Sequence, residues 1–232
     1  ALLGPPVPFD AGTVAARARA LAALPYTPPP PVSADWQGLS YDQFRGIWFD
    51  GRYTLFRDRP GAVQAELLVA GTYFTHKIAL NAVEGGMAQP IRFSLDAFGR
   101  TAEFPDLPAD GTGYAGFRLL GELEVEGRFQ EYTVFQGASY FRAIARGQAY
   151  GLSARGLALN TGGRNGEEFP IFREFWIEAA PPGDPVAVVH ALLDSPSVAG
   201  AYTFRITKGE ATRMEVASRL FPRVDLAEAG IA

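Results

Sequence analysis

The chain has 232 residues, 47% of them hydrophobic and 20% charged, which is enough for one large globular domain with a sizeable core. Its formal net charge of -4 and the absence of a long run of Lys or Arg argue against a nucleic-acid partner. The absence of cysteine excludes disulfides and thiolate metal sites, and no apolar stretch reaches the roughly 20 residues that a transmembrane segment needs.

The first segment is predicted to be a helix followed by a proline-rich spacer. Asp10 can cap the helix, helix-forming residues fill positions 14–24, and Pro25 ends it. The prolines of positions 28–31 form an extended run, which we expect to lay the helix across the main domain. The alternative for this run is a docking ligand for another protein.

From Tyr41 onward the hydrophobic pattern has the period of two that is typical of β-strands. The dipeptide Asp50-Gly51 predicts a hairpin turn between two short strands. Further alternating segments occupy residues 76–83, 202–207 and 213–220. Strands with one polar face and short turns between them favour an antiparallel β-sandwich over a βαβ fold.

This pattern divides the chain into two parts. Residues 1–31 are assigned to the N-terminal helix and spacer, and residues 32–232 to part of a large all-β sandwich. Within the second part, Ser94 to Tyr114 holds three Gly, two Pro and four acidic residues with little periodicity, which predicts a long surface loop. The first residues lack the charged segment of a signal peptide, so the chain is either cytosolic or the processed form of an exported protein.

The segment from residue 137 to residue 178 contains the candidate binding residues. Its predicted strands carry faces that mix aromatic side chains with Arg and Glu, as where Glu174 shares a face with Trp176. Such a mixture suits a sugar, because a pyranose ring stacks on an aromatic plane while charged groups bind its hydroxyls. Cross-strand pairing on a solvated sheet face is the alternative. The predicted substrate-binding residues are Tyr140, Arg142, Tyr150, Ser153, Arg155, Glu174 and Trp176.

Carboxylates are the candidates for glycosidic chemistry, since inverting hydrolysis needs two of them roughly 6.5–9.5 Å apart. Glu167 and Glu168 are adjacent, so in an extended segment they point to opposite faces and cannot form that pair. Asp194 begins a predicted turn in which its side chain bonds the local backbone. Glu174 is either a ligand for a sugar hydroxyl or the ion-pair partner of a neighbouring Arg.

Other catalytic chemistries find little support in the sequence. The two histidines, His76 and His190, are far apart and lack metal-type spacing, so we expect no metal and no cofactor. Ser139 and Ser153 have no His partner nearby in sequence and no GxSxG motif occurs, which argues against a serine hydrolase.

Four long segments resemble the periplasmic glucan biosynthesis protein G/D family: GASYFRA, GQAYGLSARGLALNTG, GEEFPIFREFWIE and ALLDSPSVAGAYTF. The resemblance implies an exported periplasmic protein with a large β-sandwich related to the galactose mutarotase fold, followed by an immunoglobulin-like domain. It also implies a role in making osmoregulated periplasmic glucans, whose backbone is β-1,2-linked glucose. Some members of the family are similar to inverting β-1,2-glucanases.

The chain is shorter than members of that family, so we expect it to be part of a longer polypeptide whose signal peptide has been removed. The catalytic acid and base are expected beyond residue 232, and no catalytic residue is assigned within the chain. The residues Thr75-His76-Lys77 depart from the more acidic pattern of the family. Two hypotheses remain open, a glucan-hydrolysing enzyme and a glucan-binding scaffold that acts through other glucan-assembly proteins. A mutarotase-like enzyme rests on fold analogy alone.

Overall fold

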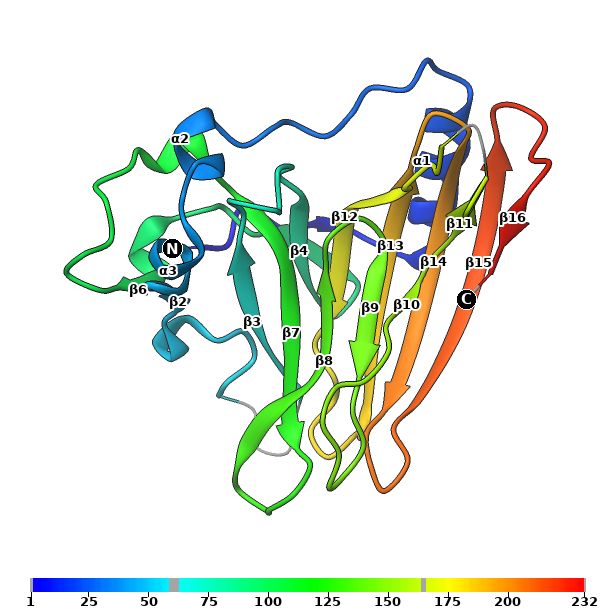
Figure 1. The fold of residues 1–232 in the computed structure, drawn as a ribbon. Coiled ribbons are helices and arrows are strands. Elements are labelled where there is room, and N and C mark those ends of the chain that lie inside the picture. The colour runs from blue at the N-terminus through cyan, green and yellow to red at the C-terminus, as the bar shows by residue number, and fades with distance from the viewer. Residues whose placement is uncertain (1, 59–62, 164–165, 232) are drawn as a thin grey trace.

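The computed structural model describes residues 2–58, 63–163 and 166–231, which form a sandwich of two β-sheets (Figure 1). The larger sheet contains β1 (Val7–Pro8), β4 (Ala79–Glu84), β5 (Met87–Pro90), β12 (Ile171–Glu178), β13 (Val186–Asp194), β14 (Val198–Thr207) and β15 (Arg213–Pro222). Its strand order is β1-β5-β4-β12-β13-β14-β15, and every neighbouring pair is antiparallel except β4 and β12.

The second sheet is antiparallel and has the strand order β10-β9-β8-β7-β3. Its strands are β3 (Gln64–Val69), β7 (Tyr114–Glu122), β8 (Phe129–Gln136), β9 (Tyr140–Ala143) and β10 (Ala154–Arg155). Two small antiparallel pairs flank the sandwich, β2 (Ile47–Phe49) with β6 (Phe98–Arg100) and β11 (Ala158–Leu159) with β16 (Ala229–Gly230). The all-β sandwich predicted from the sequence is confirmed.

Aromatic rings fill the space between the two sheets. Alternate residues of β14 point inward, so that Phe204 is buried and its ring lies 4.9 Å from that of Phe135 on the facing sheet. Phe135 also contacts the rings of Phe117, Phe141 and Phe175 at 5.1 to 5.8 Å. Burial of each such side chain contributes about 1.5–3 kcal/mol, so this cluster is a main source of the sandwich's stability.

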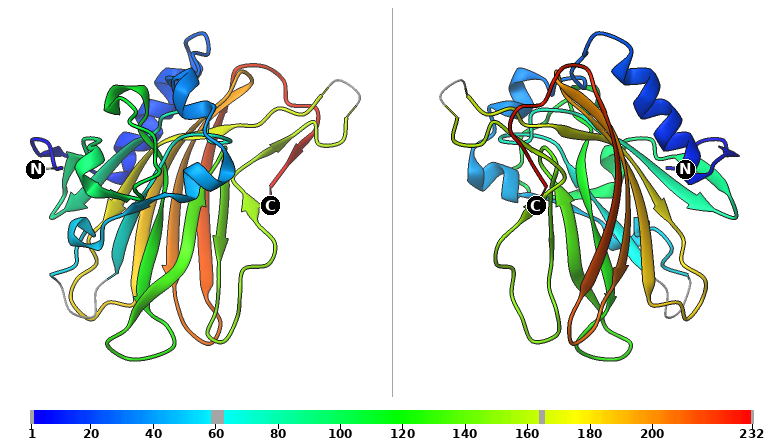
Figure 2. Two further views of the ribbon diagram at one scale, coloured as in Figure 1. Left: turned by 60° about the vertical axis from the view of Figure 1, so that its left-hand side comes forward. Right: turned by 90° about the vertical axis from the view of Figure 1, so that its right-hand side faces the viewer.

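The outer face of the seven-stranded sheet is covered by α1 (Ala11–Ala22), as the right-hand view of Figure 2 shows. Val14 and Ala18 of the helix are buried against a small apolar cluster that includes Trp176 and Leu192. The helix begins as predicted, with Asp10 Oδ1 accepting a hydrogen bond from the amide of Thr13 at 3.0 Å. None of the helices described is long and apolar enough to span a membrane.

Replacing Asp10 by alanine should lower the free energy of unfolding by about 0.5–2 kcal/mol, because an amide at the start of α1 loses its acceptor. Urea unfolding of the full-length protein measures the change. Ser33 is a matched control, since it stands at the N-terminus of the short helix α2 (Ala34–Gln37) and its side chain makes no capping bond. Equal losses in Asp10→Ala and Ser33→Ala would contradict the capping role.

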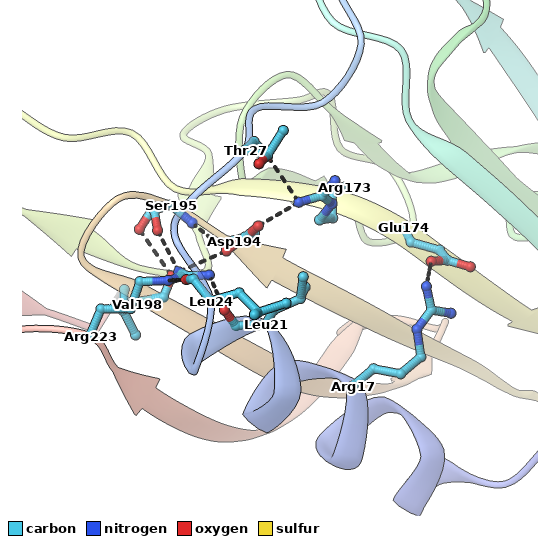
Figure 3. A network of polar contacts seen from close by, with 10 residues as sticks. All are labelled: Arg17, Leu21, Leu24, Thr27, Arg173, Glu174, Asp194, Ser195, Val198 and Arg223. Atoms are coloured by element: carbon cyan, nitrogen blue, oxygen red, sulfur yellow. Dashed lines mark hydrogen bonds and ion pairs between the residues drawn. The ribbon is translucent and has the colours of Figure 1, made fainter.

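A buried carboxylate joins the C-terminal end of α1 to the sheet (Figure 3). Asp194, at the end of β13, is 1% exposed and pairs with Arg173 at 2.5 Å and with Arg223 at 2.9 Å. The two arginines also donate hydrogen bonds to the main-chain carbonyls of Leu21, Leu24, Thr27 and Ser195. The predicted local bond exists as well, from the Ser195 amide to Asp194 Oδ1.

The predicted hairpin at Asp50-Gly51 is wrong. The strand before it, β2, pairs with β6, which lies inside the segment predicted to be a loop. Asp50 Oδ1 instead accepts a hydrogen bond from the amide of Arg52 at 2.9 Å and caps the short 3-10 helix Gly51–Tyr53. The Asp50 side chain thus starts a helical turn instead of a hairpin turn, because β2 pairs with β6 and not with the residues that follow Gly51.

Candidate functional site

Two adjoining cavities open where the loop after β3 approaches β8 and β9. Their volumes are about 220 and 540 Å³, and they share a set of six lining residues: Tyr73, Phe74, Gln136, Gly137, Ala138 and Tyr140. The larger cavity extends over β9 to Arg142 and Ser153, whereas the smaller one runs inward to Phe172 and Phe175. We call the two cavities together the groove.

The backbone around the groove adopts uncommon conformations. Thr72 has φ 46° and Ala138 has φ 42°, a left-handed region that non-glycine residues seldom occupy. Gly137 has φ 77°, and a Cβ on it would lie 3.2 Å from Cε1 of Phe74. Left-handed non-glycine residues cost on the order of 1–3 kcal/mol each and tend to cluster at functional sites. The groove is therefore held in shape by the surrounding fold.

Three of the predicted binding residues line the groove. Tyr140 and Arg142 both project from β9, as their spacing of two predicts, and Ser153 lies on the segment before β10. Arg142 is exposed, and it forms no ion pair with any residue in the part of the chain described. Tyr73 is 84% exposed at the rim. The groove thus offers aromatic rings beside an uncommitted guanidinium.

Arg155 lies next to the groove but is already engaged. Its guanidinium stands 5.8 Å from the ring centre of Tyr140 and 5.7 Å from that of Phe169. It also pairs with Glu167 and donates to Oγ1 of Thr161 at 2.7 Å. The structure therefore brings Arg155 to Tyr140, where its contacts hold the two rings rather than leave it free for a ligand.

Tyr150 lies beside a polar network on the same sheet. Among the described residues, none meets the geometry of a hydrogen bond to its buried hydroxyl. Burial raises the pKa of Tyr150, and the nearby Glu131 carboxylate raises it further. Arg118 of β7 bridges Glu66 at 2.6 Å and Glu131 at 3.0 Å. Sequence reasoning missed this network, although Arg118 is the only charge in the apolar run 114–121 and a lone charge there is a usable signal.

Glu174 and Trp176 lie elsewhere, on the outer face of the seven-stranded sheet. Trp176 is 3% exposed, stacks on Phe9 at 5.5 Å and lies under the guanidinium of Arg17. Arg17 of α1 also pairs with Glu174. The spacing correctly puts both residues on one face, but α1 covers that face, so the structure does not bring them to the groove.

Comparison with known proteins assigns the chain to a family. Residues 9–232 match the family model described as periplasmic glucan biosynthesis protein, MdoG. The chain belongs to the MdoG family. It is 46% identical over 226 residues to glucans biosynthesis protein G of Shewanella baltica and 45% identical to glucans biosynthesis protein G 1 of Shewanella oneidensis. Each match covers 97% of this chain and 42% of the relative, so the chain spans less than half the length of these MdoG-family proteins.

The described carboxylates and one of the two histidines of this MdoG-family chain lie away from the groove lining. None of the described residues that line either cavity is Asp or Glu, and His76 lines the smaller one. Glu168 accepts a hydrogen bond from Ser197 Oγ at 2.6 Å, and His190 is buried between Glu178 and Thr203. Among the residues described, no three His, Asp or Glu side chains gather closely enough to hold a metal ion.

Proposed function

We propose that the groove binds a β-linked glucan and that the protein takes part in periplasmic glucan biosynthesis through this binding. One observation carries the proposal. In a chain of the MdoG family, the groove sets the rings of Tyr73, Phe74 and Tyr140 beside Arg142, which has no ion-pair partner among the described residues. The proposed location is the periplasm, in keeping with the family.

The chemistry of a glucan matches these side chains. The axial C–H bonds of a glucose ring present a weakly positive face that is attracted to the negative face of an aromatic ring. The equatorial hydroxyls can then donate to or accept from polar groups at the ring's edge. Arg142 and Gln136 supply donors, and Ser153 supplies a hydroxyl that does both. The combined volume suits a short stretch of chain rather than a single small molecule.

Binding and cleavage are separate parts of the proposal. Inverting hydrolysis requires a carboxylic acid and a carboxylate on opposite sides of the bond. Since no described groove residue is acidic, the chain as described supplies binding, and we propose that the acid and base come from the remainder of a longer protein. The second candidate, a non-catalytic scaffold that works with other glucan-assembly proteins, is favoured by the same lack of carboxylates.

Replacing Arg142 by alanine should weaken binding of linear β-1,2-glucan by about 10- to 100-fold, since a hydrogen bond to a charged group contributes about 1.5–3 kcal/mol. Replacing Tyr140 by alanine should also weaken it, because the sugar loses an aromatic plane on which to stack. Calorimetric titration of the full-length protein measures this. Arg205→Ala is the matched control, because Arg205 is an exposed arginine on β14, outside the groove. Unchanged affinity in both groove variants would refute the proposed site.

A second measurement separates the enzyme from the scaffold. The full-length protein is incubated with linear β-1,2-glucan and new reducing ends are counted. Shorter glucans with new reducing ends support hydrolysis, whereas tight binding without new ends supports the scaffold. In the hydrolytic case, Arg142→Ala should raise KM, because the residue holds substrate and touches no reacting bond.

A further inference from the structure

The outer face of the β2–β6 pair carries an exposed tryptophan that the groove does not use. Trp48 is 52% exposed, between the buried Ile47 and Phe49, and its cross-strand partner is Gly99. A Cβ built on Gly99 would lie 2.5 to 2.6 Å from three atoms of the indole, Cε2, Cζ2 and Nε1. Three nearly equal distances mean that the ring lies flat on the glycine. One face of the indole therefore covers the backbone and the opposite face points to solvent.

A polar hollow of about 360 Å³ lies at the end of the β2–β6 pair, where Gly46 precedes β2 and Thr101 follows β6. It is lined by Asp42, Gln43, Arg45, Gly46, Thr101 and Glu103. The amide of Thr101 donates to the carbonyl of Gly46 at 2.8 Å, one position beyond the last β2–β6 pair, Ile47 and Arg100. Gly46 and Thr101, which line the hollow, are each two positions along the chain from the Trp48–Gly99 pair.

The charged groups of this hollow have no ion-pair partner among the described residues. Asp42, Arg45 and Glu103 make no ion pair within the described ranges. The guanidinium of Arg45 stands 5.6 Å from the ring centre of Tyr41, which is itself exposed. The hollow thus gathers two carboxylates, a guanidinium and the Thr101 hydroxyl near an aromatic ring. The described carboxylates and the guanidinium form no ion pair with each other.

We propose that Trp48 and this hollow form a second carbohydrate site, which takes one or two sugar units of the same glucan as the groove. The identity of the ligand rests on the proposed function. The free indole face stacks on the C–H face of a sugar ring, and the adjacent charged groups bind its hydroxyls. Figure 1 places β2 and β6 on the far side of β3 and β7 from β9 and β10, so the two sites engage different stretches of a chain. A polymer held at both sites gains apparent affinity through effective concentration.

Fluorine NMR on the full-length protein labelled with fluorotryptophan tests the proposal. The Trp48 signal is assigned by its loss in Trp48→Tyr. Because Trp36 and Trp176 are buried, their signals serve as internal references for this part of the chain. We expect linear β-1,2-glucan to shift the Trp48 signal, and Trp48→Ala to weaken binding of long glucan about tenfold while short oligosaccharides keep their affinity for the groove. Trp48→Tyr should restore most of the loss, since it keeps an aromatic plane.

The groove variant Arg142→Ala separates this proposal from the proposed function. If glucan still shifts Trp48 in Arg142→Ala, the second site binds by itself. If glucan binds the wild type and that binding depends on Arg142, but Trp48 does not respond, the second site is overturned and the groove stands. If Trp48 responds while neither groove variant changes affinity, the groove proposal fails and the second site stands. No response of Trp48 at saturating long glucan overturns the second site in every case.

Discussion

Phe135→Ala should lower the free energy of unfolding by about 3–5 kcal/mol, the usual cost of removing a fully buried aromatic ring. Phe135 is 0% exposed and contacts four rings, which come from both sheets of the sandwich. Its removal leaves a cavity that the rigid strands on either side cannot fill. A loss of this size is a large part of the 5–15 kcal/mol that stabilises a typical domain.

Denaturant unfolding of the full-length protein, followed by near-ultraviolet circular dichroism, measures the effect of Phe135→Ala. Val216→Ala provides the control, because Val216 is an apolar residue on the outermost strand β15 and is 46% exposed. We expect the control to change stability by less than about 0.5 kcal/mol. A loss below about 1 kcal/mol in Phe135→Ala would show that the aromatic cluster is not the common core of the two sheets.

Asp194→Ala should destabilise the protein by about 3–5 kcal/mol, because it leaves two guanidinium groups without their shared carboxylate. Arg223 has only 9% of its side chain exposed, so the charge it leaves behind is poorly solvated. The same change removes the support for the hydrogen bonds that Arg223 donates to the carbonyls of Leu21 and Leu24. The C-terminal turn of α1 should therefore loosen before the rest of the fold.

Two measurements check the role of Asp194. Denaturant unfolding gives the global loss, and hydrogen exchange at the amides of α1 reports the local loosening. Glu210→Ala is the matched control, since Glu210 forms an exposed pair with Arg146 and should contribute less than about 1 kcal/mol. If Asp194→Ala and Glu210→Ala have the same effect on α1 exchange, the buried network does not hold the helix.

The sequence predicted the class of fold because strand alternation is a local property. The inward face of β14, with Tyr202, Phe204 and Ile206, follows directly from its spacing. The position of Tyr140 and Arg142 on one face of β9 follows in the same way. Spacing does not reveal what covers a face, however. Glu174 and Trp176 share a face as predicted, yet it is the face on which α1 packs.

Long-range pairing explains the other differences. The partner of β2 lies some fifty residues later, in a segment whose Gly and Pro content hides a three-residue strand. Gly99, inside that strand, has a role that only the pairing reveals, since it makes room for the indole of Trp48. The groove likewise depends on the approach of Phe74 to Gly137, two residues that no local pattern connects.

The interleaving of the two sheets has a consequence for how the chain folds. Strand β3 pairs with β7, although β4 and β5 of the other sheet lie between them in the sequence. Arg118 of β7 donates a hydrogen bond to Glu66 of β3, 52 positions earlier. Strand β4 pairs with β12, and the Asn81 side chain donates a hydrogen bond to Glu174, which lies 93 positions later in the chain. Neither sheet can be completed before most of the chain is available. A high contact order of this kind slows folding, and nascent chains cut short before β12 should present unpaired edges to chaperones and proteases.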